Sequence, residues 1–392
     1  MRDEDWHFTN VAPIAERTFS LAKPAAVGKA DIEHFRLRHE EWSGIVLVNG
    51  MFSRELSTLG ALGKGITVRA LSEGTSDIPS AGQEIIGKVA PADASFTALN
   101  AAFMQDAILI HVSKDASIDL PIHIMHVNAG INVRQASHPR VVILGERNSR
   151  AVIVESFFSA RDSEYLTNAV TEVVLDEGAY LAHYKLQRES TAGFHIGTTA
   201  VRQGRTSNYV SFSFATGAAL SRTNIYTTLD GEAATCTLNG LYMVDGKQHV
   251  DHQTKIEHVQ PHCPSHEVYK GILDGESHGV FNGKVYVHPE AQKTDGKQSN
   301  NNLLLSDRAR IDTKPQLEIF ADDVKCTHGA TVGRLDEVGL FYMKSRGIGD
   351  ARARQLLTYA FAADVLEMIE LDELREALEA MVLHRFTKQL AD

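Results

Sequence analysis

Apolar and polar positions follow three different patterns along the chain. Residues 1–100 are mixed, with two runs typical of amphipathic helices and one run, 43–52, typical of a strand. From 101 to 340, short apolar runs are separated by Gly, Asp and Asn, which predicts a β-rich core. Helical periodicity returns over 341–392. We therefore expect a β core between a largely helical N-terminal region and a helical C-terminal region.

The middle region repeats one element. An apolar strand ends in Leu, and an acidic or Gly-rich turn, a small residue and a second apolar strand follow. Irregular repeats of about this length favour a β-solenoid, in which each coil stacks on the previous one. An antiparallel sandwich or barrel with regular turns is the alternative. The aligned leucines are spaced 31, 54, 44 and 32 residues apart, at Leu144, Leu175, Leu229, Leu273 and Leu305.

Two amphipathic helices are predicted near the C-terminus, over 350–369 and 372–386. The first places Leu356, Ala360 and Leu366, together with Ala363, on one stripe. Such stripes usually pack inward, so the pattern favours a lid on the β core over a docking surface.

Composition and charge narrow the function classes. The chain has 39 basic and 50 acidic residues among 392, a net charge of −11. A sequence-independent nucleic-acid binder needs surplus cations, so that class is excluded. No apolar run approaches the length of a membrane span, and the first residues lack the apolar centre of a signal peptide. We expect a soluble cytoplasmic protein.

Cysteine usage excludes two further classes. The three cysteines, Cys236, Cys263 and Cys326, are too few and too scattered for a disulfide framework. No Cys-x-x-Cys pair is present, so the chain has no zinc ribbon and no self-contained iron–sulfur motif.

Histidines are concentrated over 249–266, and imidazole and thiolate are good ligands for zinc or iron. Pro261 and Pro264 break any helix there, and on a strand His252 and His258 share a face. We favour a structural interpretation over a metal site. The six candidate ligands are His249, His252, His258, His262, Cys263 and His266.

The polar stretch 280–307 offers a catalytic interpretation through Lys293, Asp295 and Lys297. Polysaccharide-cleaving β-helices use carboxylates and basic groups in this way. Asn and Gln inside a solenoid also form hydrogen-bonded ladders, and we favour that structural interpretation here.

Cys326 and His328 form the pair with the most direct chemical interest. On a strand they point to the same face, with Cβ atoms about 6–7 Å apart from a rise of about 3.3 Å per residue. This spacing suits two ligands of one metal or cluster better than a thiolate–imidazolium pair. A buried structural thiol is the alternative for Cys326.

Long blocks of the chain resemble the SufB/SufD family of the SUF iron–sulfur cluster assembly system. They include "DTKPQLEIFADDVKCTHGATVGRLD" (312–336), "AQKTDGKQSNNNLLLS" (291–306) and "SRGIGDARARQLLTYAFAADVLEMI" (345–369). Together with upstream blocks, the resemblance covers about residues 95–370. The Cys-Thr-His-Gly-Ala-Thr-Val-Gly form resembles the SufD branch.

The resemblance implies a right-handed parallel β-helix with helical N-terminal and C-terminal regions. It also implies a non-enzymatic scaffold that pairs with a SufB-type paralogue and carries a SufC-type ABC ATPase on its C-terminal helices. His328 matches an interface histidine proposed as a ligand of a transient cluster shared with SufB, and Cys326 matches the same motif. Our candidates for ATPase contact are Arg346, Leu356, Leu357, Tyr359 and Phe361.

Several alternatives stay open at this point. The chain first pairs either with SufB or with a second copy of itself, and a reduced flavin is a further candidate cofactor of the complex. No cofactor is expected on the isolated chain. The competing functions are a stand-alone His-rich metal-binding module and a β-helix enzyme acting on polysaccharide.

Overall fold

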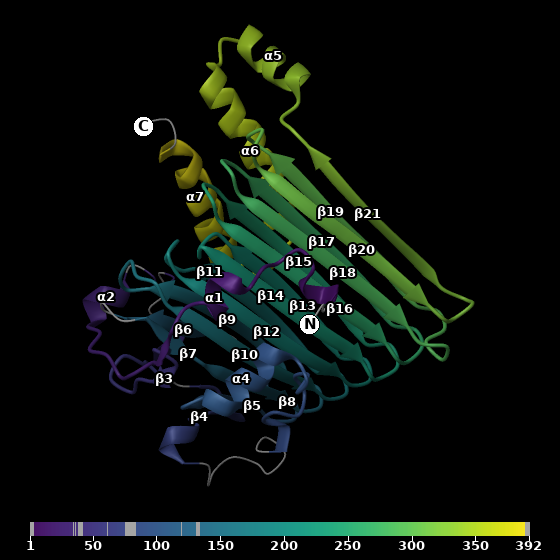
Figure 1. The fold of residues 1–392 in the computed structure, drawn as a ribbon. Helices are drawn as coiled ribbons and strands as arrows, with labels where there is room; N and C mark the ends of the chain where they lie inside the picture. The colour runs from purple at the N-terminus through teal and green to yellow at the C-terminus, as the bar shows by residue number, and fades with distance from the viewer. Residues whose placement is uncertain are drawn as a thin grey trace.

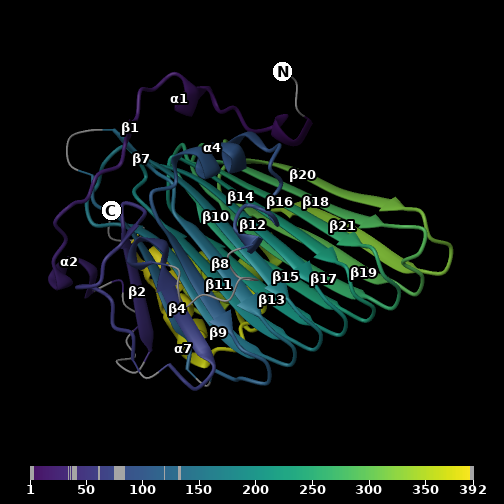
Figure 2. The same ribbon diagram turned by 90° about the horizontal axis from the view of Figure 1, so that it is seen from below.

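Two stacked sheets form a β-solenoid of about seven turns (Figures 1 and 2). This computed structural model describes residues 4–388 except 34, 36, 38–41, 61, 75–83, 119 and 131–133. From β8 onward, successive strands alternate between the two sheets, and all of these strands pair in parallel. The solenoid prediction is therefore confirmed, and the antiparallel sandwich is excluded.

The described strands fall into an 11-stranded and a 10-stranded sheet. In spatial order the first contains β20 (Arg310–Ile319), β18 (His278–Val287), β16 (His249–His258), β14 (Leu220–Leu229), β12 (Phe194–Gln203), β10 (Leu166–Leu175), β8 (Arg140–Gly145), β5 (Ala107–Val112) and β4 (Ile66–Ala70), with β7 (Gln135–Ser137) beside β10 and β1 (Ser20–Leu21) beside β7. The second contains β21 (Lys325–Gly333), β19 (Asp295–Leu304), β17 (Pro264–Leu273), β15 (Thr235–Val244), β13 (Asn208–Ala215), β11 (Tyr180–Arg188), β9 (Arg150–Ser159), β6 (Ile122–Asn128), β2 (Ser43–Val48) and β3 (Met51–Phe52).

Strand pairing sets the length of one coil at 26 to 32 residues, read between in-register partners from β10 to β20. The leucine repeat follows this register only in part. Leu175 and Leu229 both pair with Gln203, so the 54-residue spacing spans two coils. Leu273 lies in the other sheet, so the 44-residue step crosses from one sheet to the other.

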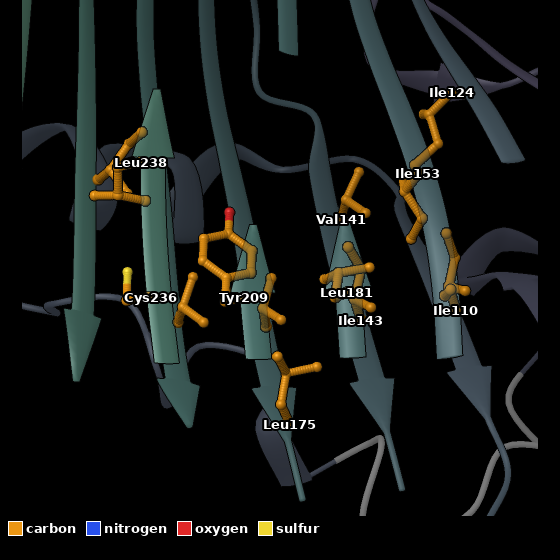
Figure 3. Packing of buried hydrophobic residues seen from close by; sticks show 14 of the residues in the cluster. Ile110, Ile124, Val141, Ile143, Ile153, Leu175, Leu181, Tyr209, Cys236 and Leu238 are labelled. Atoms are coloured by element: carbon orange, nitrogen blue, oxygen red, sulfur yellow. The ribbon is translucent and has the colours of Figure 1, made fainter. Parts of the chain in front are cut away.

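The space between the sheets is filled by two kinds of side chain. A large apolar cluster occupies one part of it, including Ile110, Ile153, Leu181 and Tyr209 (Figure 3). Later coils also hold large rings in the interior, and Tyr242 fits because its in-register neighbour on the next coil of the same sheet is Gly271. An alanine Cβ at Gly271 would lie 2.3 Å from the Tyr242 ring, closer than any real contact.

Polar side chains in the interior form hydrogen-bonded ladders. Asn302 donates to the Asn300 oxygen at 2.6 Å, and the Tyr242 hydroxyl donates to Asn302 at 2.6 Å. The structural interpretation of the Asn-rich stretch is confirmed for these residues.

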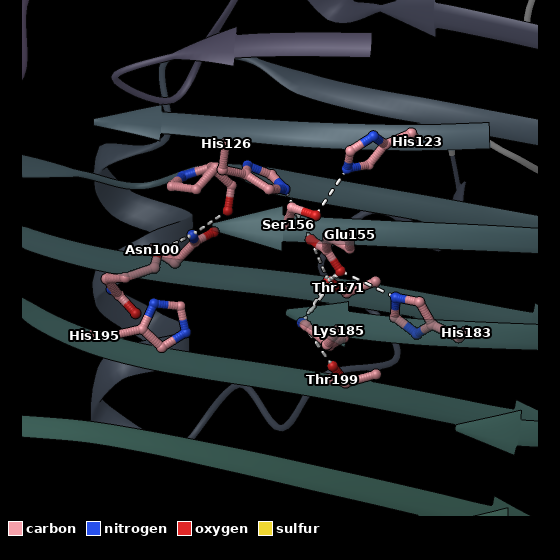
Figure 4. A network of polar contacts seen from close by, with 12 residues as sticks. Asn100, His123, His126, Glu155, Ser156, Thr171, His183, Lys185, His195 and Thr199 are labelled. Carbon is pink, nitrogen blue, oxygen red and sulfur yellow. Dashed lines mark hydrogen bonds and ion pairs between the residues drawn. The ribbon is translucent and has the colours of Figure 1, made fainter. Parts of the chain in front are cut away.

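A buried carboxylate organises the interior of the first coils (Figure 4). The oxygens of Glu155 lie 2.9 Å from His126 Nε2, 3.0 Å from His183 Nε2 and 3.2 Å from Lys185 Nζ. Burial alone would raise the pKa of Glu155, but Lys185 and the two imidazoles hold it well below its usual value.

Several N-terminal segments cover the outer face of the 11-stranded sheet (Figure 2), whereas α2 packs against the 10-stranded sheet, where Ile32 shares an apolar cluster with Val46 and Met125. Trp6 stacks on the buried guanidinium of Arg222, with 3.7 Å from Cζ to the ring centre, and Arg222 pairs with Asp251 at 2.8 Å. The helices of this part of the chain are η1 (Glu4–Trp6), α1 (Ala12–Ala15), α2 (Lys29–Glu33), η2 (Leu71–Glu73) and α4 (Ser95–Phe103).

The C-terminal helices cover the outer face of the 10-stranded sheet (Figure 1). They are α5 (Glu337–Ser345), α6 (Asp350–Leu366) and α7 (Asp372–Lys388). The lid interpretation holds for α7 and the second half of α6, whose apolar residues share a cluster with Leu241 and Ile272 of the sheet. None of the described helices combines the length and apolar character of a membrane span.

The predicted stripe of α6 was wrong in register. Leu366 is buried, but Ala360 is exposed and Leu356 is half-buried. The error arose because the buried face mixes small and polar residues, so apolar side chains alone do not reveal it. That face consists of Ala353, Gln355, Thr358, Ala362, Val365 and Leu366.

We expect Gly271→Ala to lower the free energy of unfolding by about 1–3 kcal/mol, because the new methyl group overlaps the Tyr242 ring. Gly333→Ala is the matched control, since no atom lies within 4 Å of a Cβ built there. Urea unfolding of both variants measures the difference. Equal midpoints would contradict the packing described for the interior.

Candidate functional site

The solenoid ends in two strands, β20 and β21, that each have a neighbour on one side only among the described residues. Figure 1 shows β21 at the outer edge, farthest from the N-terminal coils. All residues of β21 except Cys326 are exposed. An edge strand presents unpaired backbone N–H and C=O groups, which makes it a template for a further strand.

Strand register places Cys326 and His328 on the inner face of this edge. Cys326 pairs with Gly296 and His328 pairs with Gln298, and both β19 partners are buried in the solenoid interior. The predicted shared face therefore exists. The two side chains line the uncovered end of the interior and do not lie on the outer wall.

Cys326 is half-buried and packs against an apolar cluster that includes Val285, Val287 and Ala291. Burial raises the pKa of the Cys326 thiol, and Asp295 adds to the rise. The thiol is therefore protonated at neutral pH, which disfavours it as a ligand in this state of the chain.

His328 is exposed and lies above a column of buried polar groups. Gln298 is its in-register neighbour, and Glu267 on β17 is the next residue in the column. Gln298 Nε2 donates to Glu267 Oε2 at 2.6 Å. Burial raises the pKa of Glu267 to about 7, against opposing hydrogen bonds from Thr254 and Gln298.

The histidine-rich segment 249–266 does not converge on one point. His252 and His258 are buried in the interior, and burial lowers their pKa values to about 3 and about 4, so both are neutral. His249 Nδ1 lies 3.1 Å from His278 Nδ1 on the next coil, and His266 is exposed on β17. His262 occupies the turn between β16 and β17 with a φ of 61°. Cys263, which follows it, is fully buried.

The candidate catalytic residues of the polar stretch are surface ion pairs. Lys293 bonds Asp323 across one coil, and Lys297 Nζ lies 3.1 Å from Asp295. Exposed pairs of this kind contribute little to stability.

Within the part of the chain that the structure describes, no three His, Cys, Asp or Glu side chains are grouped as a metal site. The inner edge of β21 therefore offers one or two ligands, which is an incomplete coordination set.

The predicted ATPase-contact residues are spread over two helices. Arg346 is exposed after α5, Leu356 and Leu357 are half-buried on α6, and Tyr359 and Phe361 pack against the apolar cluster beneath that helix. Lys270 Nζ lies 4.7 Å from the Phe361 ring centre.

Sequence reasoning missed the most exposed apolar surface of the C-terminal region. In α5, Val338 is 75% exposed, Phe341 74% and Tyr342 58%, and the Arg346 guanidinium lies 5.1 Å from the Tyr342 ring. We call these four residues the α5 patch. The available signal in the sequence was the dense apolar run in "EVGLFYMKS". In the structure only Leu340 of that run is buried.

Comparison with known proteins gives two family matches. The family model "SUF system FeS cluster assembly, SufBD core domain" matches residues 125–361, and "SufBD protein N-terminal region" matches residues 1–124.

Relatives match over almost the whole chain. An iron–sulfur cluster assembly SufBD family protein of Synechocystis is 34% identical over 97% of this chain and 86% of its own length. The iron–sulfur cluster assembly protein SufD of Escherichia coli is 32% identical over 99% and 88%, respectively. The chloroplastic protein ABCI7 of Arabidopsis thaliana is 32% identical over 96% and 80%.

The raised pKa of Glu267 makes stability depend on pH. In the unfolded chain its pKa is near 4.5 and in the folded chain about 7, so its contribution is present below 4.5 and lost as pH rises through 7. Glu267→Gln does not titrate. As the pH rises from 4.5 to 8, we expect the free energy of unfolding of the variant to increase relative to that of the wild type by up to about 3 kcal/mol.

Urea unfolding at several pH values measures this gain. Glu257→Gln is the control of opposite sign, because Lys255 and His288 outweigh burial and lower the Glu257 pKa, so that its contribution is lost as pH falls. Parallel stability curves for wild type and Glu267→Gln would show that the pKa of Glu267 is the same in the folded and unfolded chains.

Proposed function

Because this chain belongs to the SufBD family of SUF iron–sulfur cluster assembly proteins, we propose that it is a SufD-like scaffold subunit whose last coil completes a cluster-building site with a SufB-type partner. The membership rests on family matches over residues 1–361 and on relatives 32–34% identical over nearly the full chain. The pairing, the ATPase and the histidine ligand are the parts that we add.

The observation that carries the proposal is the combination of an open strand edge with an incomplete ligand set. His328 lies on the terminal strand, exposed, on a face that no further coil covers among the described residues. A partner that docks on the same edge would supply the ligands that this site lacks. A strand of the partner would also satisfy the unpaired backbone groups of β21.

Exposed apolar side chains at the same end support docking there. Phe320 is 57% exposed, Val332 50% and Ile319 38%. They lie on or beside the last strands, β20 and β21. A SufB-type paralogue is the partner that we propose for this end, and a second copy of this chain is the competing occupant.

In this proposal, His328 coordinates iron transiently. A neutral imidazole binds iron as an uncharged ligand, and soft thiolates bind it more tightly. We propose that the cluster is cargo, that His328 contributes one ligand, and that cysteine and carboxylate ligands come from the partner. Cys326 would join only after losing its proton. Electron supply, including a reduced flavin, belongs to the complex in this proposal.

We propose that the C-terminal helices bind a SufC-type ATPase and that ATP hydrolysis takes place only on that partner. The α5 patch supports this placement, because three large apolar side chains and one arginine are exposed on a helix that stands away from the solenoid (Figure 1). Arg346 belongs to both this patch and the predicted contact set. Leu356, Leu357, Tyr359 and Phe361 extend the proposed surface along α6.

A cytoplasmic location completes the proposal. Among the relatives, the Arabidopsis protein is chloroplastic by its name.

We expect His328→Ala to reduce iron and acid-labile sulfide on the complex co-expressed with SufB-type and SufC-type partners and purified without air. The complex should stay intact, because an exposed side chain at the edge contributes little to folding. His266→Ala is the matched control, a histidine that is also exposed but lies on the outer wall of β17. Unchanged iron and sulfide in His328→Ala would remove His328 from the site.

We expect Phe341→Ser to weaken binding of the ATPase by at least about tenfold, since a central aromatic anchor is worth about 2 kcal/mol or more. Phe320→Ser is the control, an exposed phenylalanine at the other surface of interest. Titration calorimetry with the purified ATPase measures both. Loss of binding in Phe320→Ser alone would move the ATPase to the open end.

A further inference from the structure

We propose that Gln298 is a positioning residue for His328, and that its side-chain oxygen accepts a hydrogen bond from one imidazole nitrogen so that the other nitrogen faces the metal. The inference deepens the proposed function and rests on it, because orientation of the ring matters for assembly only if His328 is a ligand.

The two residues are neighbours by strand register. His328 on β21 pairs with Gln298 on β19, and both lie on the inner face of the sheet. In-register residues of adjacent parallel strands lie about 4.8 Å apart, so a glutamine side chain reaches the ring above it. Gln298 is only 4% exposed, whereas His328 is open to solvent.

The amide of Gln298 is held in one orientation. Its Nε2 donates to Glu267 Oε2 at 2.6 Å, on the side of the column away from His328. Gly283 on the facing sheet makes room for the amide, since an alanine Cβ there would lie 2.2 Å from Nε2. With Nε2 engaged, the amide cannot turn over without losing this bond.

The side-chain oxygen of Gln298, Oε1, is buried and has no hydrogen-bond partner. A buried acceptor without a partner costs about 1–3 kcal/mol, so such atoms call for an explanation. An imidazole N–H from the residue directly above would satisfy it. Ligating histidines almost always donate their second ring nitrogen to such an acceptor, which fixes the tautomer and the direction of the ring.

The other acceptors near this end are engaged or lie farther from His328. Glu267 Oε1 is also buried without a partner, but it is one coil deeper in the same column. The Asn300 oxygen accepts from Asn302, and Asp295 lies on the outer face of β19. The Thr313 hydroxyl on β20 is also buried without a partner, and it supplies the matched comparison.

The test is the tautomer of His328 in the full chain, read from side-chain nitrogen shifts in histidine-labelled protein and assigned with His328→Ala. In the wild type, we expect the tautomer ratio of His328 to differ from that of the exposed His266. In Gln298→Met, which keeps the length of the side chain and removes the amide, the ratio should move to that of His266. Thr313→Val and the buried-interior control Gln203→Leu should leave it unchanged.

Three outcomes of the tautomer measurement overturn the inference. The first is a wild-type His328 with the same tautomer ratio as His266, a comparison that needs no variant to fold. The second is a ratio unchanged in folded Gln298→Met. The third is a shift caused by Thr313→Val instead, which would assign the role to Thr313.

Iron and sulfide on the assembled complex separate this inference from the proposed function. If both hold, His328→Ala loses the cluster and Gln298→Met lowers iron content several-fold. If His328→Ala keeps its iron, the proposed function fails, while the tautomer measurement still decides whether Gln298 orients the ring. If His328→Ala loses iron and Gln298→Met has wild-type iron, His328 is a ligand that needs no positioning by Gln298.

Discussion

Strict in-register pairing of parallel strands is the constraint on which the rest of this molecule depends. Each coil saturates the backbone of the previous coil, so residues far apart in sequence are stacked in fixed columns. A large ring at one level of a column needs a small residue at the next level of the same column, as Tyr242 needs Gly271. Because no further coil follows among the described residues, the backbone N–H and C=O groups of the last coil are paired on one side only. The same register brings His328, Gln298 and Glu267 into one column.

Several charged side chains are buried in the solenoid or under the segments that cover it, and their charges are compensated locally. Glu155 is surrounded by Lys185 and two imidazoles, and the outer-face pair of Arg140 and Glu172 is buried almost completely. Breaking one member of such a group leaves an uncompensated buried charge, which is strongly destabilising. These groups therefore restrict which strand can lie beside which, and we regard them as determinants of register.

Sequence alone predicted the fold class well, because coil-length repeats and family blocks both depend on local patterns. It predicted that Cys326 and His328 share a face for the same reason, since strand parity is local. It did not predict Gln298 or Glu267 as neighbours of His328, because that requires the register between coils. It misjudged α6, where the buried face includes Gln355 and Thr358. It also overlooked α5, where apolar residues are exposed and not packed.

The contacts of the N-terminal segment with later coils have a consequence for the order of folding during synthesis. Trp6 is held by Arg222, Thr9 donates to Asp251 at 2.5 Å, and Glu4 pairs with Lys314. The three contacts therefore cannot all form until the coil that carries Lys314 has been synthesised, about 300 residues after Glu4. At about 5–20 residues per second, synthesis of this stretch takes about 15 to 60 seconds. The Glu4 contact is then the last of the three to form during synthesis, and a chain truncated before β20 would lose it while Trp6 and Thr9 keep their partners.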